Sequence, residues 1–320
     1  MRKPLVLLAL LALLLSGCGG PSAAQHTPPG QPGGTAPLPA PTQGVVPAPM
    51  PVPPAEPTKP PAVTINGCPV KDGWDCNWPA RFAAAQAIVD GKSGALAIVL
   101  RDRKTGAVWR TGDTNTKMWT GSTIKLAMAT HILESDRELS TAQSKDMRDM
   151  LSWSSDAAAD RLWAQFGKHT MLGAFRERYG MSGLTMAGSN NDWGALACRA
   201  DDLSNLMSYI LDKLNLNDRS YLTNAMRKVS DVQHWGVWSA GADLNPGNKN
   251  GWLENFHSGQ SHWCTSTVGF AGPDERYTLS IMYQMSPERD SLDLGARTLS
   301  DITAKVFGVT NPPKPTIRPT

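Results

Sequence analysis

The spacing of apolar and polar positions along the chain is typical of strands in some segments and of helices in others. Apolar or alternating runs over 95–100, 106–110, 263–271 and 277–284 predict strands, and a further strand is expected around Lys249. Helical patterns occupy 80–89, 122–134, 140–152, 156–166, 169–179, 200–214, 217–230 and 292–307. Strands at both ends with helices between them predict an α+β fold: an antiparallel sheet flanked by helices, plus an all-helical lobe. A ligand site is expected between the two parts. The polar stretch from Leu253 to His262 is expected to be a loop, either a lid or a surface excursion.

The first 18 residues have the pattern of a bacterial leader. A positive start is followed by an apolar run from Leu5 to Leu15, which is too short for a mature membrane span. Leu15-Ser16-Gly17-Cys18 resembles a lipoprotein cleavage box, so Cys18 is the expected lipid attachment site; an ordinary secretory signal is the alternative. The protein is therefore expected to be lipid-anchored, at the outer face of the cytoplasmic membrane or elsewhere on the periplasmic or cell-envelope side.

Composition divides the rest of the chain into three parts. Residues 19–62 are rich in Pro, Gly, Ala and Thr, which predicts an extended, disordered tether. Residues 63–310 are long enough for one domain or two closely packed lobes, and 311–320 form a Pro-rich tail predicted to be disordered. The net charge of +3 is mild, and no basic cluster indicates nucleic-acid binding. Nothing in the sequence indicates an oligomer, so a monomer is expected.

Four cysteines follow Cys18. Cys68 and Cys76 are close in sequence and are expected to bridge each other, which leaves Cys198 and Cys264 to pair by arithmetic. A zinc site is the competing interpretation, but the spacing does not match a zinc-ligand pattern. We therefore expect no metal and no cofactor.

The stretch from Gly121 to Lys125 carries the clearest candidate chemistry. Ser122 and Lys125 stand one helical turn apart at the start of an apolar helix. A serine hydroxyl becomes a nucleophile when a nearby base takes its proton, and a buried lysine with a lowered pKa can do so. The alternative is that Ser122 only caps the helix.

Two later motifs complete an ordered set. Ser155-Asp156-Ala157 lies in a helix-rich segment, and Lys249-Asn250-Gly251 precedes the last strands. The order S-x-x-K, S-D-N, K-T-G is the signature of class A β-lactamases and penicillin-binding proteins. Over roughly residues 80–310 the chain therefore resembles this serine hydrolase superfamily, which implies the same two-part α+β layout.

The resemblance implies a role for each motif residue. Ser155 would relay a proton between Lys125 and the leaving group, although a helix cap is its alternative role. Asp156 would be a buried structural residue of the loop. In the last motif, Lys249 would attract a substrate carboxylate, Asn250 would offer a hydrogen bond, and Gly251 would allow close approach of the strand. The backbone N–H groups of Ser122 and Trp252 would form the oxyanion hole.

Three positions depart from the family pattern. Ala157 stands where the motif has Asn, and Asn250 stands where it has Thr. The stretch 180–198 lacks the Glu that activates the deacylating water in class A enzymes, and Asp192 is its only acid and the candidate replacement. Without a water activator, the acyl-enzyme is expected to form and persist.

These residues favour an envelope-anchored serine hydrolase or acyltransferase that acts on a β-lactam, a cell-wall peptide or an ester. A true class A-like β-lactamase and a non-catalytic binding lipoprotein are the alternatives. The missing Glu and Ala157 argue against the first alternative. The intact set of Ser122, Lys125, Ser155 and Lys249 argues against the second.

Overall fold

The computed structural model describes residues 64–65, 68–188, 192–257, 260–287 and 291–317. The predicted leader, the lipid site Cys18, the tether and the last residues of the tail lie outside the described residues. Within the described part, no helix is long and apolar enough to cross a membrane.

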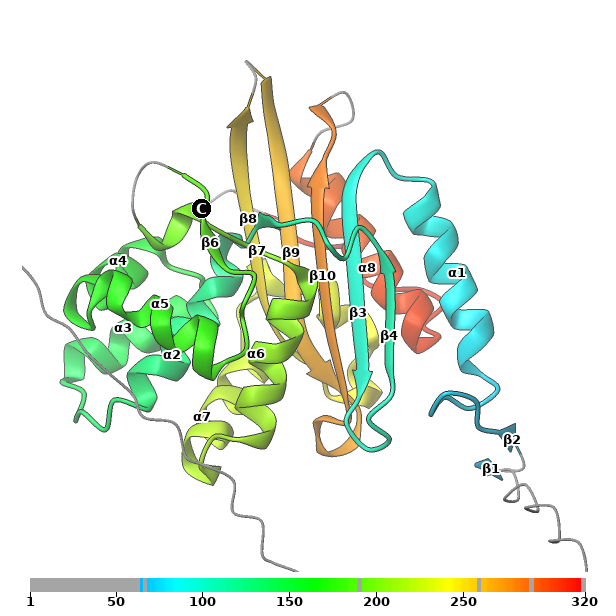
Figure 1. Cartoon of the computed structure of the whole chain (residues 1–320), viewed down its shortest axis with the longest axis horizontal. Coiled ribbons are helices and arrows are strands. Elements are labelled where there is room, and N and C mark those ends of the chain that lie inside the picture. The colour runs from blue at the N-terminus through cyan, green and yellow to red at the C-terminus, as the bar shows by residue number, and fades with distance from the viewer. Residues whose placement is uncertain (1–63, 66–67, 189–191, 258–259, 288–290, 318–320) are drawn as a thin grey trace, which may run out of the picture. The chain divides into compact units, whose positions relative to one another are not determined.

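A five-stranded antiparallel sheet forms the centre of the fold, in the order β4-β3-β10-β9-β8 (Figure 1). Its strands come from both ends of the domain: β3 (Gly94–Asp102), β4 (Val108–Gly112), β8 (Gly247–His257), β9 (Gln260–Ala271) and β10 (Tyr277–Met285). Strand β8 is therefore an edge, and its outer side faces the helical part. The predicted loop from Leu253 to His262 is wrong, because β8 and β9 pair continuously from Gly247–Phe270 to His257–Gln260.

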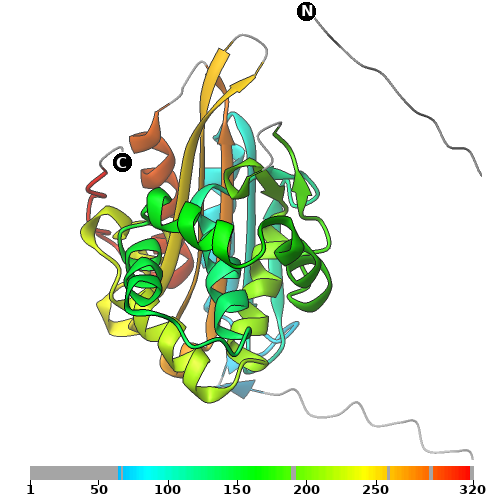
Figure 2. The same ribbon diagram turned by 90° about the vertical axis from the view of Figure 1, so that its left-hand side faces the viewer.

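Each face of the sheet packs against helices, which explains why its central strands are apolar without alternation. Leu96, Ile98 and Leu100 join one core with α1 (Trp78–Asp90) and α8 (Leu292–Phe307). Ala97 and Val99 point to the other core, beneath the helices that follow β4. Figure 2 shows these helices in front of the sheet. The predicted α+β architecture is confirmed.

The helical part contains α2 (Ile124–Leu133), α3 (Thr141–Ser152), α4 (Asp156–Gln165), α5 (Met171–Gly173), α6 (Ala200–Asp212) and α7 (Leu216–Arg227). A small sheet of β5 (Met118–Trp119), β7 (Leu196–Cys198) and β6 (Thr185–Met186) lies beside it. Short helical turns complete the domain: η1 (Gly121–Thr123), η2 (Lys168–Thr170), η3 (Ala174–Arg178), η4 (Trp193–Ala195), η5 (Asp231–Gln233), η6 (Gly236–Ala240), η7 (Ala242–Leu244) and η8 (Pro273–Glu275). Two paired strands of two residues each, β1 (Thr64–Ile65) and β2 (Cys68–Pro69), precede α1.

The two predicted disulfides have different outcomes in the structure. Cys76 is disulfide-bonded, but the side chain of Cys68 is not among those described, so their pairing stays a prediction. Cys198 and Cys264 are both buried and are not bonded to each other, so that predicted bridge is wrong. The reason is topological: Cys198 lies on β7 opposite Met118 in the small sheet, whereas Cys264 lies on β9 of the central sheet.

Candidate active site

Ser122 lies at the junction between the helical part and the edge of the central sheet. It belongs to η1, which leads directly into the apolar helix α2, and only 7% of its surface is exposed. Two hydroxyls fix the preceding turn, because Thr123 Oγ1 and Ser266 Oγ both donate to the Thr120 carbonyl, each at 2.7 Å. Gly121 supports the turn with a positive φ of 50°. The nucleophile candidate is therefore held by backbone and buried side chains.

Strand β8 approaches this turn closely at the residues predicted to form the oxyanion hole. The N–H of Asn250 donates to Gln233 Oε1 at 3.0 Å and so points away from β9. Alternate N–H groups of a strand point to the same edge, which directs the Trp252 N–H toward η1 as well. A Cβ on Gly251 would lie 2.8 Å from the Ser122 nitrogen, and one on Gly121 would lie 2.8 Å from the Trp252 nitrogen. The nitrogen atoms of the two predicted oxyanion donors therefore both lie at the close contact between η1 and β8.

This close approach predicts the effect of a single methyl group. In Gly251→Ala, the new Cβ would lie 2.4 Å from the Thr120 carbonyl oxygen and would separate β8 from η1. Loss of one oxyanion donor costs about 10²–10³ in rate, so we expect acylation of Ser122 to fall by at least about tenfold. Stopped-flow acylation measures the rate, and Gly173→Ala, where a Cβ meets nothing within 4 Å and φ is −59°, is the control. An unchanged rate in Gly251→Ala would exclude this oxyanion geometry.

Lys125 is fully buried on the first turn of α2. Its Nζ donates to the Ser154 carbonyl at 2.6 Å and forms an ion pair with Asp156, and it lies 4.6 Å from the centre of the Trp193 ring. In the described part of the chain no hydrogen bond joins it to Ser122 Oγ. Burial lowers the pKa of Lys125, while the Asp156 carboxylate opposes that change. The lysine is thus moved toward the proton-accepting form that a general base needs.

Ser154 is the serine that the structure places between the two lysines. Its Oγ lies 2.9 Å from Lys249 Nζ and 3.5 Å from Lys125 Nζ, and the residue is buried with a positive φ of 61°. Ser155, the serine predicted from the motif, instead caps α4 by accepting from the Ala158 N–H. Ser154 rather than Ser155 therefore lies between the two lysines, one residue before the serine that the motif predicted.

The same shift changes the roles predicted for Asp156 and Ala157. The side chain of Asp156 is 63% exposed and pairs with Lys125, so it is a member of the site rather than a buried loop residue. It stands two residues after Ser154, at the spacing where the motif pattern has Asn after its serine. The predicted departure at Ala157 is wrong. The actual departure is a carboxylate, and hence a negative charge, next to the candidate base.

Lys249 is also fully buried, and its ammonium has three partners. It contacts Ser154 Oγ, Gln233 Oε1 at 2.8 Å and the Asn250 carbonyl at 2.9 Å. Burial, and then the charge of Lys125, lower the pKa of Lys249 well below its usual range, while Asp156 acts in the opposite direction. Gln233 was not predicted from the sequence, because no motif marks it and it stands 16 residues before Lys249 in the short turn η5.

Asn250 does not offer its side chain to the cleft. It is fully buried, and its Nδ2 donates to the carbonyls of Gln233 and Trp235. The hydrogen bond to substrate that was predicted for this side chain is therefore wrong. The side chain fastens β8 to the turn that carries Gln233 instead.

Asp192, the candidate deacylation base, lies at the start of η4. Its Oδ1 accepts from the Ala195 N–H at 3.2 Å, which is the bond of a helix cap. The next residue, Trp193, is the one that reaches Lys125; its Nε1 donates to Asp160 at 2.8 Å. In this segment the indole ring of Trp193 contacts Lys125, while the Asp192 carboxylate caps η4.

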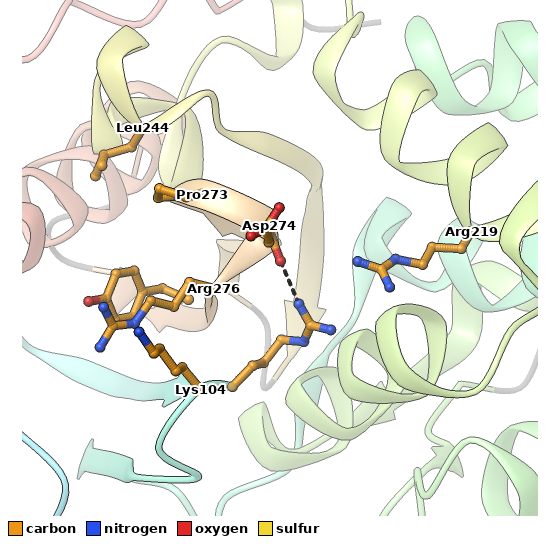
Figure 3. Close-up of a pocket in the computed structure, with 8 residues that line it drawn as sticks. Lys104, Arg219, Leu244, Pro273, Asp274 and Arg276 are labelled. Carbon is orange, nitrogen blue, oxygen red and sulfur yellow. Dashed lines mark hydrogen bonds between the residues drawn. The ribbon is translucent and has the colours of Figure 1, made fainter.

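Away from these residues, a hollow of about 710 Å³ is lined by Arg103, Lys104, Arg219, Leu244, Pro273, Asp274, Arg276 and Tyr277 (Figure 3). Its positive charge is largely neutralised, because carboxylates hold all three guanidinium groups: Arg103 with Asp212, Arg219 with Glu275, and Arg276 with Asp102. It therefore offers little to an anion. The described residues contain no group of three or more His, Cys, Asp or Glu that could hold a metal ion.

Comparison with solved structures identifies the architecture. The TLA-3 extended-spectrum β-lactamase matches 73% of this chain and all of its own, with a TM-score of 0.61 and 12% identity. A class A β-lactamase from Mycobacterium abscessus matches 71% of this chain and 98% of its own, with a TM-score of 0.56 and 16% identity. The chain has the class A β-lactamase fold. At these identities the likeness concerns the β-lactamase fold and not the reaction.

Sequence comparison gives a more modest result. No family model matches the chain. The protein of Mycobacterium tuberculosis named "Putative lipoprotein LppW" is 26% identical over 227 residues, which cover 67% of this chain and 70% of the relative. The relative's name agrees with the lipoprotein pattern around Cys18. The chain is thus a β-lactamase-fold protein with a relative named as a lipoprotein.

Proposed function

We propose that this protein is a lipid-anchored serine hydrolase or acyltransferase of the cell envelope, with Ser122 as its nucleophile. The observation that carries the proposal is the convergence of four groups: Ser122 on η1, Lys125 one turn later, and Ser154 Oγ between Lys125 and Lys249. A purely structural role does not explain two buried lysines around one serine hydroxyl, because the burial of each lysine carries a desolvation cost. Proton transfer accounts for all of these groups.

The acylation step follows from this arrangement. Ser122 Oγ attacks the carbonyl carbon of an ester or amide, and Lys125 in its neutral form takes the hydroxyl proton. The N–H groups of Ser122 and Trp252 stabilise the oxyanion that develops. The bond to the leaving group then breaks, and the leaving group receives a proton through Ser154. The product is an ester on Ser122, together with a free alcohol or amine.

Hydrolysis of that ester is expected to be slow. Activation of the water that hydrolyses the ester needs a base near Ser122. Asp192 instead caps η4, and the Trp193 ring lies against Lys125. A persistent acyl-enzyme favours a penicillin-binding or acyl-transfer role over an antibiotic-destroying hydrolase.

The experiment is covalent labelling of the full-length chain in detergent with a fluorophosphonate, followed by intact-mass and peptide mass spectrometry. Attack by Ser122 Oγ on phosphorus releases fluoride and leaves one adduct, which we expect to be absent in Ser122→Ala. With p-nitrophenyl butyrate, we expect a butyryl adduct on Ser122 that persists for minutes or longer. Failure of both reagents to modify Ser122 would contradict the proposal.

A non-catalytic binding lipoprotein is the second candidate, and one observation favours it. Lys125 Nζ is engaged with Asp156 and the Ser154 carbonyl rather than with Ser122 Oγ. Such contacts are often rearranged when substrate binds, so they do not exclude a base. The labelling experiment separates the two candidates, because a binding module would leave Ser122 unmodified.

A further inference from the structure

Gln233 is a fully buried glutamine with every polar atom of its amide in use. Its Nε2 donates to the carbonyls of Leu151 and Ser152 at 2.8 and 2.7 Å. Its Oε1 accepts from Lys249 Nζ at 2.8 Å and from the Asn250 N–H at 3.0 Å. Because two carbonyls face one end and two donors face the other, this network fixes which end is oxygen.

The two donors that hold Gln233 Oε1 would also suit a carboxylate oxygen. An ammonium and a strand N–H on the same side of β8, next to the relay serine Ser154, are the groups to which an anionic substrate would bind. In this chain the glutamine oxygen takes both of them. A substrate carboxylate could reach Lys249 only by displacing a buried amide whose other end is held by two carbonyls.

Charges at the site also oppose an anion. Asp156 places a largely exposed carboxylate on Lys125, and Asp160, also exposed, acts on the same lysine. Burial lowers the pKa of Lys249, which weakens the positive charge that would compensate them. Lys249 has no carboxylate among its hydrogen-bond partners in the described residues, and its two acceptors and one hydroxyl also satisfy a neutral amine.

We propose that Gln233 occupies the place of a substrate carboxylate, so that the site accepts neutral acyl esters or amides and rejects those with a carboxylate beside the reacting group. This inference rests on the proposed function of Ser122. It replaces the attraction of Lys249 for a substrate carboxylate that the motif led us to expect. Gln233 is then a specificity residue, and Lys249 acts on Ser154 rather than on substrate.

A matched pair of activated esters tests the inference on the full-length chain. p-Nitrophenyl butyrate is neutral, whereas mono-p-nitrophenyl succinate has a similar length and ends in a carboxylate. We expect the neutral ester to acylate Ser122 at least tenfold faster in the unaltered chain. In Gln233→Ala, which frees Lys249 and the Asn250 N–H, the ratio should move at least tenfold toward the succinate. Gln165→Ala, an exposed glutamine of α4, should leave the ratio unchanged.

The unaltered chain alone can decide the matter if Gln233→Ala does not fold. Equal or faster acylation by the succinate would overturn the inference while leaving Ser122 as nucleophile. Failure of the neutral ester to acylate a chain that fluorophosphonate labels would overturn it too. If neither the esters nor the fluorophosphonate modify Ser122, the proposed function itself fails, and this distinguishes the two failures.

Discussion

Ser154→Ala is expected to lower the acylation rate of Ser122 by about 10²–10⁴, the range for loss of a positioned proton-transfer group. The Ser154 hydroxyl lies between the two lysine Nζ atoms, and no other hydroxyl of the described residues contacts both. Its removal interrupts the path to the leaving group and leaves Lys249 with one partner fewer. Stopped-flow release of p-nitrophenol from the neutral ester measures the rate. A poorer leaving group, such as an unactivated alkyl ester, should show the larger loss.

Ser155→Ala is the matched control, because it removes the neighbouring hydroxyl without touching either lysine. Its side chain caps α4, so we expect a loss of stability of about 1 kcal/mol and an acylation rate within about twofold of the unaltered chain. Thermal unfolding separates the two effects. If Ser155→Ala slowed acylation as strongly as Ser154→Ala, or Ser154→Ala did not slow it at all, the one-residue shift of the motif would be wrong.

This shift shows how far the sequence could lead. The sequence Ser154-Ser155-Asp156 offers two serines, and the second forms the familiar Ser-Asp pair, so the motif pattern selects Ser155. The structure decides differently: Ser154 has a positive φ and its hydroxyl contacts the lysines, while Ser155 is the N-cap of α4 and its hydroxyl accepts from the Ala158 N–H. Backbone direction at one residue is not encoded in a motif. The first motif has no such ambiguity, because its i, i+3 helical spacing selects Ser122 and Lys125 alone.

The architecture was predictable for a related reason. Apolar runs such as 95–100 are long, and both faces of β3 are buried, so the strand signal is strong. The β8–β9 hairpin was missed at its outer end, where Glu254 and Gln260 are exposed and the apolar pattern is lost. Gln233 and the failed Cys198–Cys264 bridge depend on contacts between distant segments. Neither spacing nor composition carries that information.

Asp156→Asn is expected to speed acylation at neutral pH by about tenfold. The Asp156 carboxylate raises the pKa of Lys125 against the lowering effect of burial, and so keeps the lysine protonated. Without that charge the pKa falls further, and a larger fraction of Lys125 is neutral and able to accept the Ser122 proton. A difference of about one pKa unit corresponds to about tenfold in the neutral fraction. An asparagine oxygen can still accept a hydrogen bond from Lys125, so the geometry is retained.

The pH dependence of acylation provides the sharper measurement. The rate should rise with pH as Lys125 loses its proton, and in Asp156→Asn this rise should occur at lower pH by about one unit or more. Asp160→Asn is the matched control. Asp160 makes no hydrogen bond to Lys125 and raises its pKa less than Asp156 does, so the pH at which the rate rises should shift less. The asparagine oxygen introduced by Asp160→Asn can still accept from Trp193 Nε1, which preserves the ring over the lysine. If the rise in rate occurred at the same pH in Asp156→Asn, or if this variant were slower at every pH, Lys125 would not be the base. Asp156 would then serve to position Lys125 and not to keep it protonated.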